Sequence, residues 1–195
     1  MTVIRCAKPL VWGEIDVPLY GLLKDWFGKD MDPPAAYCIA VDPEKFWFIA
    51  THGDVASLHP QSRPAKFTPE LWKFDLAEVF IKNKTGDGYL EFNLSPNSAW
   101  WSAEFEAPRR RIHEDAFPGV ETYSELAPDG GWVAALSIPL KILEDRVGFG
   151  EGTCMNVAFI LGSPAQRFFS ASDLGAGAPD FHRPNRFQQI SFKNA

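Results

Sequence analysis

The sequence predicts an all-β protein, an antiparallel β-sandwich of about nine or ten strands with long loops and one or two short helical turns. Apolar runs of strand length recur along the chain, and segments rich in Gly, Pro, Asn and Asp separate them. Two of these runs alternate apolar and polar residues with a period of two, and no alternation of helices with strands is present. Together these observations favour two packed sheets over a helical or α/β fold.

The expected strands cover residues 35–41, 45–52, 76–82, 89–95, 132–138, 153–161, 167–171 and 187–192. Short polar turns at 42–45 and 84–88 connect two pairs of these runs, so both pairs are predicted to form antiparallel hairpins. Helical pattern is limited to residues 18–27 and to single turns that begin at Pro69 and Pro139, because Pro suits the first helical position.

Length and composition indicate one folded domain. At 195 residues the chain is long enough to bury a substantial core, and its 46% hydrophobic and 14% aromatic content is that of a globular protein rich in rings. We therefore expect residues 1–195 to form a single sandwich, with residues 1–34 as a lead-in segment that packs on it.

The charge pattern excludes a nucleic-acid partner. A formal net charge of -6 provides no broad basic surface, and the only basic cluster is Arg109, Arg110 and Arg111. We expect these arginines to be solvated or to pair with neighbouring acids rather than to contact phosphates. The neighbouring acids are Glu104, Glu106, Glu114 and Asp115.

Cysteine usage and the absence of long apolar runs indicate a cytoplasmic protein. Cys6, Cys38 and Cys154 form an odd, widely spaced set, which is typical neither of a disulfide framework nor of a zinc site. The first residues lack the apolar stretch of a secretory signal, and no run is long enough to cross a membrane. A secreted protein whose signal had been removed would show the same pattern.

Residues 76–82 and 89–94 contain the most informative pattern. With a period of two, one face carries only apolar residues, namely Ala77, Val79, Ile81, Leu90, Phe92 and Leu94. The opposite face carries Glu78, Glu91 and Asn93. Carboxyl and amide groups beside aromatic rings can hold a polyhydroxylated ligand, because they bond hydroxyls while a ring covers the C–H face. Glu78 lies in an apolar strand, so it needs a partner, water or a ligand.

Tryptophans near these strands are candidates for the aromatic part of such a site. Trp72 lies just before the first strand in a segment bounded by Pro69. Trp100 and Trp101 are adjacent, so in an extended strand they point to opposite faces, and one of them is expected to meet solvent or ligand.

The order of several motifs resembles that of family 9 carbohydrate-binding modules and of the wider DOMON-like sandwich group. The resemblance covers most of the chain from Tyr37 onward and rests on the common order and spacing of motifs rather than on any single one. The motifs are AYCIAVD at 36–42, FWFIA at 46–50, LW at 71–72, DLAEVFI at 75–81, YLEFN at 89–93, WVAALSIP at 132–139, MNVAF at 155–159, DFHRP at 180–184 and FQQISF at 187–192.

The resemblance implies a ligand pocket and a non-catalytic role. In such modules a Trp before the strand, a Glu on it and an Asn on the next strand line the pocket, and here these positions correspond to Trp72, Glu78 and Asn93. A terminal sugar is clamped between two aromatic rings, and calcium can serve as a structural ion. Loop aspartates that could contribute to calcium binding are Asp54, Asp129 and Asp173.

Two positions depart from this pattern. Glu91 stands where a basic residue is expected two positions before the Asn, which replaces donors by an acceptor. The second clamping Trp is absent from residues 167–173, which leaves Phe168, Phe169 or Phe181 as substitutes.

The sequence therefore predicts non-catalytic binding of a mono- or oligosaccharide by Trp72, Glu78, Glu91, Asn93 and Phe169, with no cofactor other than a possible structural calcium ion. Two alternatives stay open. Glu78 and Glu91 could act as the two carboxyl groups of a glycoside hydrolase. A ligand-less DOMON-like domain could instead bind a partner protein through its exposed rings. The sequence does not give the oligomeric state.

Overall fold

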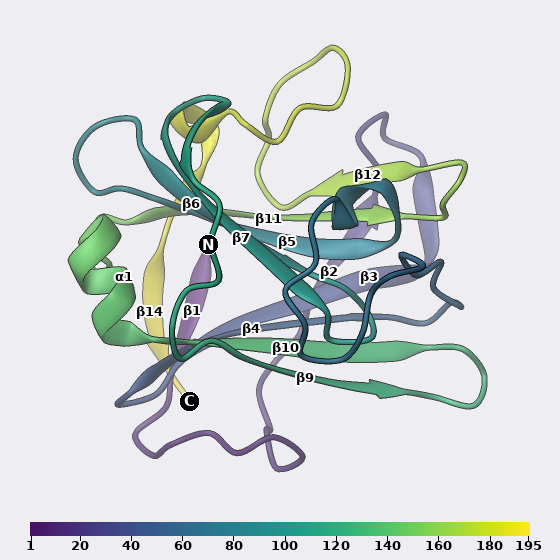
Figure 1. Cartoon of the computed structure of the whole chain (residues 1–195), viewed down its shortest axis with the longest axis horizontal. Coiled ribbons are helices and arrows are strands. Elements are labelled where there is room, and N and C mark those ends of the chain that lie inside the picture. Colours follow the sequence, from purple (N-terminus) through teal and green to yellow (C-terminus); the bar gives the residue numbers. More distant parts are fainter.

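The computed structural model describes residues 1–195 and shows two seven-stranded sheets packed as a sandwich (Figure 1). The first sheet contains β1 (Thr2–Arg5), β2 (Tyr20–Lys24), β3 (Asp30–Val41), β4 (Lys45–His52), β9 (Glu121–Leu126), β10 (Trp132–Pro139) and β14 (Ser191–Asn194). Its strand order is β14-β1-β3-β4-β10-β9, and β2 pairs with the free part of β3.

The second sheet contains β5 (Leu76–Lys82), β6 (Tyr89–Leu94), β7 (Trp100–Ala107), β8 (Arg110–His113), β11 (Cys154–Leu161), β12 (Arg167–Ser170) and β13 (Gln188–Gln189). Its order is β12-β11-β5-β6-β7-β8, with β13 paired to β11. Three short helices complete the fold: η1 (Leu71–Lys73), α1 (Leu140–Val147) and η2 (Pro184–Arg186).

The predicted fold class is confirmed, and so are both predicted hairpins, because β3–β4 and β5–β6 are antiparallel pairs. The helical turns expected after Pro69 and Pro139 are present as η1 and α1. The structure has fourteen strands, more than the nine or ten expected, because several are short pieces with little sequence pattern.

The N-terminal 34 residues contribute strands to the first sheet. β1 lies between β14 and β3 and is parallel to both, while β2 runs antiparallel to β3 with Tyr20 opposite Tyr37. The prediction of a helix at residues 18–27 is therefore wrong. Pairing with the edge of β3 satisfies the backbone of this segment, and Gly21 weakens its helical tendency.

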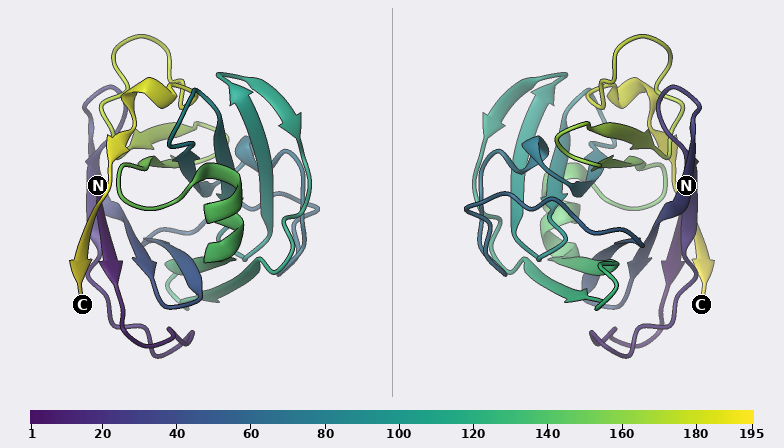
Figure 2. Two further views of the ribbon diagram at one scale, coloured as in Figure 1. Left: turned by 90° about the vertical axis from the view of Figure 1, so that its left-hand side faces the viewer. Right: turned by 90° about the vertical axis from the view of Figure 1, so that its right-hand side faces the viewer.

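The core lies between the two sheets and follows the alternation seen in the sequence. Ala77, Val79 and Ile81 of β5 and Leu90, Phe92 and Leu94 of β6 all belong to one cluster of 28 buried residues. α1 lies at one end of the sandwich, where Leu143 and Val147 join the same cluster (Figure 2). Burial of this inward face fixes the register of β5 and β6, and thereby places Glu78 and Glu91 on the outward face.

The outward face of the second sheet is also largely apolar and is covered by loops. Phe80, Tyr89 and Phe105 point outward, and Phe181 and Phe187 of the C-terminal segment pack on them in a second cluster of 13 buried residues. At the other end of this face, Leu71 of η1 belongs to the same cluster. The part of the face between these two covers is the cavity described below.

Asp42 anchors the β3–β4 turn on the first sheet. Its Oδ1 accepts hydrogen bonds from the backbone N–H groups of Glu44 and Lys45, and its Oδ2 accepts from the backbone N–H of Leu10 and from Nε1 of Trp47. These four bonds to one buried carboxylate connect the hairpin to the N-terminal loop.

An aromatic stack lies on the outer face of the first sheet. The ring of Tyr123 stacks between Trp12, at a centroid distance of 5.5 Å, and Trp47, at 5.7 Å. Trp12 is half-buried, as Trp72 of η1 is, so it provides a comparable indole on the opposite surface of the sandwich.

All three cysteines are free. None of the helices is long and apolar enough to cross a lipid bilayer.

Candidate functional site

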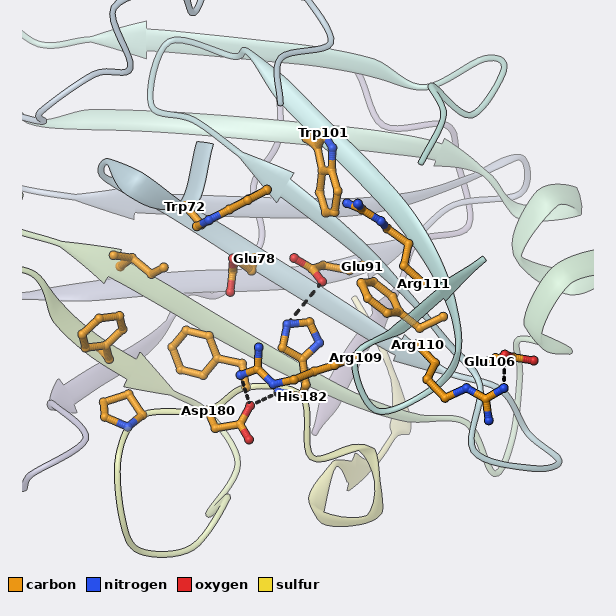
Figure 3. Close-up of a pocket in the computed structure, with 15 residues that line it drawn as sticks. Trp72, Glu78, Glu91, Trp101, Glu106, Arg109, Arg110, Arg111, Asp180 and His182 are labelled. Atoms are coloured by element: carbon orange, nitrogen blue, oxygen red, sulfur yellow. Dashed lines mark hydrogen bonds and ion pairs between the residues drawn. The ribbon is translucent and has the colours of Figure 1, made fainter. Parts of the chain in front are cut away.

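A cavity of about 700 Å³ lies on the outward face of the second sheet (Figure 3). Its floor is formed by β5, β6 and β11, and its rim by η1, the β7–β8 turn, β12 and the loop before η2. The lining residues are Trp72, Glu78, Glu91, Trp101, Phe105, Glu106, Arg109, Arg110, Arg111, Ile160, Phe168, Pro179, Asp180, Phe181 and His182.

Two indoles form one wall of the cavity. Trp72 of η1 is half-buried, and its ring meets that of Trp101 on β7 edge to face, with centroids 5.4 Å apart and an interplanar angle of 68°. Gln166 Nε2 donates to the Trp72 carbonyl at 3.0 Å and so holds η1 against the sheet. Trp101 Nε1 donates to Glu114 Oε1 at 2.9 Å. Trp101 is therefore fixed in place, whereas the partly open ring of Trp72 can contact a ligand.

Phe168 and Phe181 form the aromatic part of another side, with ring centroids 6.2 Å apart. Phe168 is half-buried on β12, and Phe181 belongs to the loop that precedes η2. Aromatic rings therefore line the cavity from two separate segments in addition to the indole pair.

Glu78 and Glu91 form the polar floor. Their residues are only 3% and 4% exposed, although both side chains line the cavity. Glu78 is opposite Asn93 and Phe80 is opposite Glu91, so the two glutamates are diagonal neighbours on one face of the sheet. Oε2 of Glu91 is buried without a hydrogen-bond partner.

Burial dominates the protonation of this pair. It raises the pKa of Glu91 to about 7, against the opposing influence of the neighbouring Asn93 amide and of Arg109 and Arg111. It also raises the pKa of Glu78 well above its usual value, and the neighbouring Glu91 carboxylate adds to this effect. Burial therefore favours the protonated form of both carboxyl groups, and a protonated carboxyl group can both donate and accept a hydrogen bond.

His182 lies beside Glu91 and is held by Tyr89. The Tyr89 hydroxyl and His182 Nδ1 are 2.6 Å apart, and the same hydroxyl oxygen accepts from the Arg109 backbone N–H at 3.3 Å. Since no other acceptor faces the Tyr89 hydroxyl, its proton is assigned to the bond with Nδ1. That assignment leaves the imidazole proton on Nε2, which lies 3.9 Å from Glu91 Oε2.

The imidazole of His182 is neutral at ordinary pH. Burial and, to a lesser extent, the Arg109 guanidinium lower the pKa of His182 to about 4, and the Asp180 carboxylate only partly opposes them. His182 is thus an uncharged neighbour of Glu91 and does not neutralise the glutamate.

Three arginines form the rim, and each is paired with an acid outside the floor. Arg109 pairs with Asp180 at 2.7 Å, and Arg110 pairs with Glu106 at 2.8 Å. Arg111 pairs with Glu114 at 2.6 Å. Figure 3 shows the first two pairs as dashed lines at the edge of the cavity, away from Glu78.

The structure brings Trp72, Glu78 and Glu91 of the predicted ligand site together around one cavity. Asn93 shares their face of the sheet but is fully buried opposite Trp101, and its amide atoms have no hydrogen-bond partner within the chain. The prediction for Phe169 needs correction. Its side chain lies fully buried in the core between the sheets, and the adjacent Phe168 lines the cavity instead, because neighbouring strand residues point to opposite faces.

The sequence did not predict which residues form the rim of this cavity. Two of the three arginines make the local ion pairs expected of them, with Glu106 and Glu114. The pairing of Arg109 with Asp180 joins segments 71 residues apart, and only the adjacency of the arginines and the DFHRP motif at 180–184 could have drawn attention to it.

No group of three or more His, Cys, Asp or Glu side chains is arranged to hold a metal ion. The calcium expectation for Asp54, Asp129 and Asp173 therefore gains no support from a cluster of acids and stays a prediction.

Comparison with known proteins places the chain in a family. No model of a known protein family matches the sequence. The chain is 31% identical over 142 residues to the UPF0462 protein C4orf33 homolog of Mus musculus, a match that covers 68% of this chain and 69% of the mouse protein. The chain belongs to the UPF0462 family.

This UPF0462 family member is also similar to a fungal protein. It is 26% identical over 145 residues to an extracellular protein of Arthroderma benhamiae. The match covers 65% of this chain and 64% of the fungal protein, so less than two thirds of that protein is represented.

Solved structures identify the fold of this family member as that of family 9 carbohydrate-binding modules. A proposed carbohydrate-binding protein of Bacteroides uniformis superposes with a TM-score of 0.67 at 15% identity and covers 98% of this chain and 99% of its own. A family 9 module of Caldicellulosiruptor kristjanssonii, solved with glucose, gives a TM-score of 0.64 at 14% identity and 99% and 96% coverage. Its complex with cellotriose gives the same score and identity, with 99% and 93% coverage. The wider DOMON-like relation stays a prediction.

Proposed function

We propose that this protein binds a mono- or oligosaccharide, without catalysis, in the cavity formed by Trp72, Glu78, Glu91 and Phe168. The observation that carries the proposal is that a partly open indole and two buried carboxyl groups line one cavity of about 700 Å³, and that Oε2 of Glu91 has no hydrogen-bond partner there. A sugar offers complementary surfaces, since its C–H face packs on an aromatic ring while its hydroxyls bond acceptors and donors.

The protonation of the floor suits hydroxyl groups. A protonated carboxyl group donates one hydrogen bond and accepts others, so Glu78 and Glu91 together can bond hydroxyls of either orientation. Each such bond replaces one to water and adds only about 1 kcal/mol, so we expect affinities on the order of micromolar to millimolar.

The comparisons support this proposal at the level of fold. The family 9 module of Caldicellulosiruptor kristjanssonii was solved with glucose and with cellotriose, and the Bacteroides uniformis protein is a proposed carbohydrate binder. Function is carried by a site rather than by a fold, so the residues of the cavity must be tested directly.

The decisive experiment is a calorimetric or NMR titration with glucose, cello-oligosaccharides and a glycan panel. Trp72→Ala is expected to weaken binding about tenfold or more, because it removes the stacking surface. Trp12→Ala is the matched control, since it removes a half-buried indole from the opposite sheet. Equal loss in both variants, or binding unaffected by Trp72→Ala, would show that the ligand does not occupy this cavity.

Glycoside hydrolysis is a second candidate, and one observation favours it: two carboxyl groups with raised pKa values share a cavity. In that case Glu78 would serve as the proton donor and Glu91 as the ionised partner. Prolonged incubation with oligosaccharides and product analysis decides between the two functions. A hydrolase releases product that Glu78→Gln abolishes, whereas a binding protein releases none.

A further inference from the structure

The charges around the cavity are unevenly neutralised. Each of Arg109, Arg110 and Arg111 makes an ion pair with an acid on the rim or beside it, at 2.6 to 2.8 Å. Neither Glu78 nor Glu91 makes an ion pair with an arginine or lysine, and His182, whose Nε2 lies 3.9 Å from Glu91 Oε2, is neutral. The chain therefore supplies no cation to the floor of its own cavity.

The two glutamates are also the most deeply buried charged residues that line the cavity. The three arginine side chains are 44% to 71% exposed, so water and salt screen them. The Glu91 side chain is 5% exposed and its Oε2 has no partner, although it faces the cavity. A charge brought to the floor by a ligand would be screened far less than one brought to the rim.

We propose that the preferred ligand is an amino sugar with a free ammonium group, which lies between Glu78 and Glu91 while the sugar ring packs on Trp72. This inference rests on the proposed carbohydrate-binding function and specifies its ligand class. An ammonium group carries three N–H donors, so one group can bond both carboxylates and a further acceptor. The diagonal placement of the glutamates on adjacent strands lets both approach one such group.

Binding of a cation has a consequence that binding of a neutral sugar lacks. The ammonium group favours the ionised forms of both glutamates, so the complex forms with release of protons near neutral pH. The other charged or titratable groups that face this pair are Tyr89, Arg109, Arg111, Asp180 and His182. The pKa of Tyr89 is raised and those of Asp180 and His182 are lowered, so these three groups are not expected to titrate near pH 7.

The test compares four monosaccharides near neutral pH with the intact chain: glucose, glucosamine, N-acetylglucosamine and glucuronate. Glucosamine is expected to bind about tenfold more tightly than glucose, because charge-assisted hydrogen bonds are about twice as strong as neutral ones. N-acetylglucosamine, which has no charge, is expected to lose this advantage. Glucuronate tests the rim arginines and is expected to bind no better than glucose.

Two further measurements locate the preference. Glu91→Gln keeps the shape of the side chain and is expected to remove most of the glucosamine advantage, whereas Glu125→Gln, an exposed glutamate of the other sheet, is expected to retain it. Calorimetry of the wild type in buffers of different ionisation enthalpy is expected to show more proton release with glucosamine than with glucose. This readout needs no variant, so it holds even if Glu91→Gln folds poorly.

The outcomes separate this inference from the proposed function. If glucose or glucuronate binds as tightly as glucosamine, the amino-sugar preference is overturned while carbohydrate binding stands. If none of these sugars nor any member of the glycan panel binds, carbohydrate binding itself fails and the preference fails with it.

Discussion

Glu78 and Glu91 face one cavity from neighbouring antiparallel strands, and neither carboxyl group is neutralised by a cation of the chain. The inward alternation of β5 and β6 imposes this placement, because the same strands fill the core with Val79 and Phe92. The unpaired acids oppose folding, since burial favours their neutral forms and costs free energy when they ionise. Two buried carboxyl groups with raised pKa values in one cavity are typical of a functional site.

This arrangement predicts a defined dependence of stability on pH. The pKa of Glu91 is about 7 in the folded chain and near 4.5 when unfolded, so between these values the unfolded state binds fewer protons. Glu91 therefore lowers the free energy of unfolding of the wild type progressively as pH rises through this range. Glu91→Gln removes this loss, and we expect it to become more stable than the wild type by about 2 kcal/mol near neutral pH.

Denaturant unfolding at several pH values between about 4.5 and 7 checks this prediction. The relevant quantity is the difference in free energy of unfolding between Glu91→Gln and the wild type. The contribution of His182 changes with pH in the opposite direction to that of Glu91, but it is present in both proteins and so cancels in this difference. Glu125→Gln is the control, because that glutamate is exposed on β9 and should give a difference that does not vary with pH. A flat difference for Glu91→Gln as well would mean that Glu91 is not desolvated as described.

The hydrogen bonds of Tyr89 provide a second prediction. Its hydroxyl bonds His182 Nδ1 and accepts from the Arg109 backbone N–H, so it connects β6 with the β7–β8 turn and the C-terminal loop. Tyr89→Phe leaves two partly buried groups without that partner and is expected to lower the free energy of unfolding by about 1–2 kcal/mol.

Chemical denaturation of Tyr89→Phe beside Tyr20→Phe is the measurement. Tyr20 is half-buried on β2, and its hydroxyl makes no hydrogen bond within the chain, so its loss should cost little. The same cost for both variants would argue that the Tyr89 hydroxyl does not contribute to stability.

Asp42 provides a third prediction. Burial alone would raise the pKa of its carboxyl group, but hydrogen bonds from Leu10, Glu44, Trp47 and Lys45 hold that pKa below its usual value. Asp42→Asn replaces one acceptor oxygen by an N–H donor that faces other N–H groups. We therefore expect this substitution to lower the free energy of unfolding by about 3 kcal/mol. The wild type should lose the same stabilisation as pH falls below about 4, where the unfolded carboxylate takes up its proton.

Thermal or denaturant unfolding near neutral pH and near pH 3 tests this account of Asp42. The difference in free energy of unfolding between wild type and Asp42→Asn should be large at the higher pH and smaller at the lower pH. Asp145→Asn on the exposed surface of α1 is the control and should match the wild type closely at the higher pH. A gap that persists unchanged in acid would contradict a role for the ionised carboxylate.

The sequence carried enough local information to predict the sandwich, both hairpins and the outward face of β5 and β6. Those features depend on a period of two and on short turns, which neighbouring residues encode. The depth of a side chain on that face depends on what covers it. Asn93 is sealed opposite Trp101, whereas Glu91, two residues away, faces the cavity, and only the packing of β7 and the loops distinguishes them.

The rim of the cavity could not be predicted for a related reason. Arg109 and Asp180 come from segments that meet only when the C-terminal loop folds over the sheet. The choice between Phe168 and Phe169 depends on the register of β12 against β11. Phe169 is paired with the core residue Phe159, whereas Phe168 is paired with Ile160, which lines the cavity. A shift of one residue would exchange the two rings.

This register gives the last prediction, which concerns the same adjacent pair. Phe169 fills the core, so Phe169→Ala is expected to lower the free energy of unfolding by about 3–5 kcal/mol. Phe168 is half-buried at the cavity and contacts Phe181, so Phe168→Ala is expected to cost less than about 1.5 kcal/mol while weakening sugar binding severalfold. Denaturant unfolding and ligand titration of both variants measure the two effects. The reverse result, with Phe168 the costlier to remove and Phe169 the one needed for binding, would place the opposite face of β12 at the cavity.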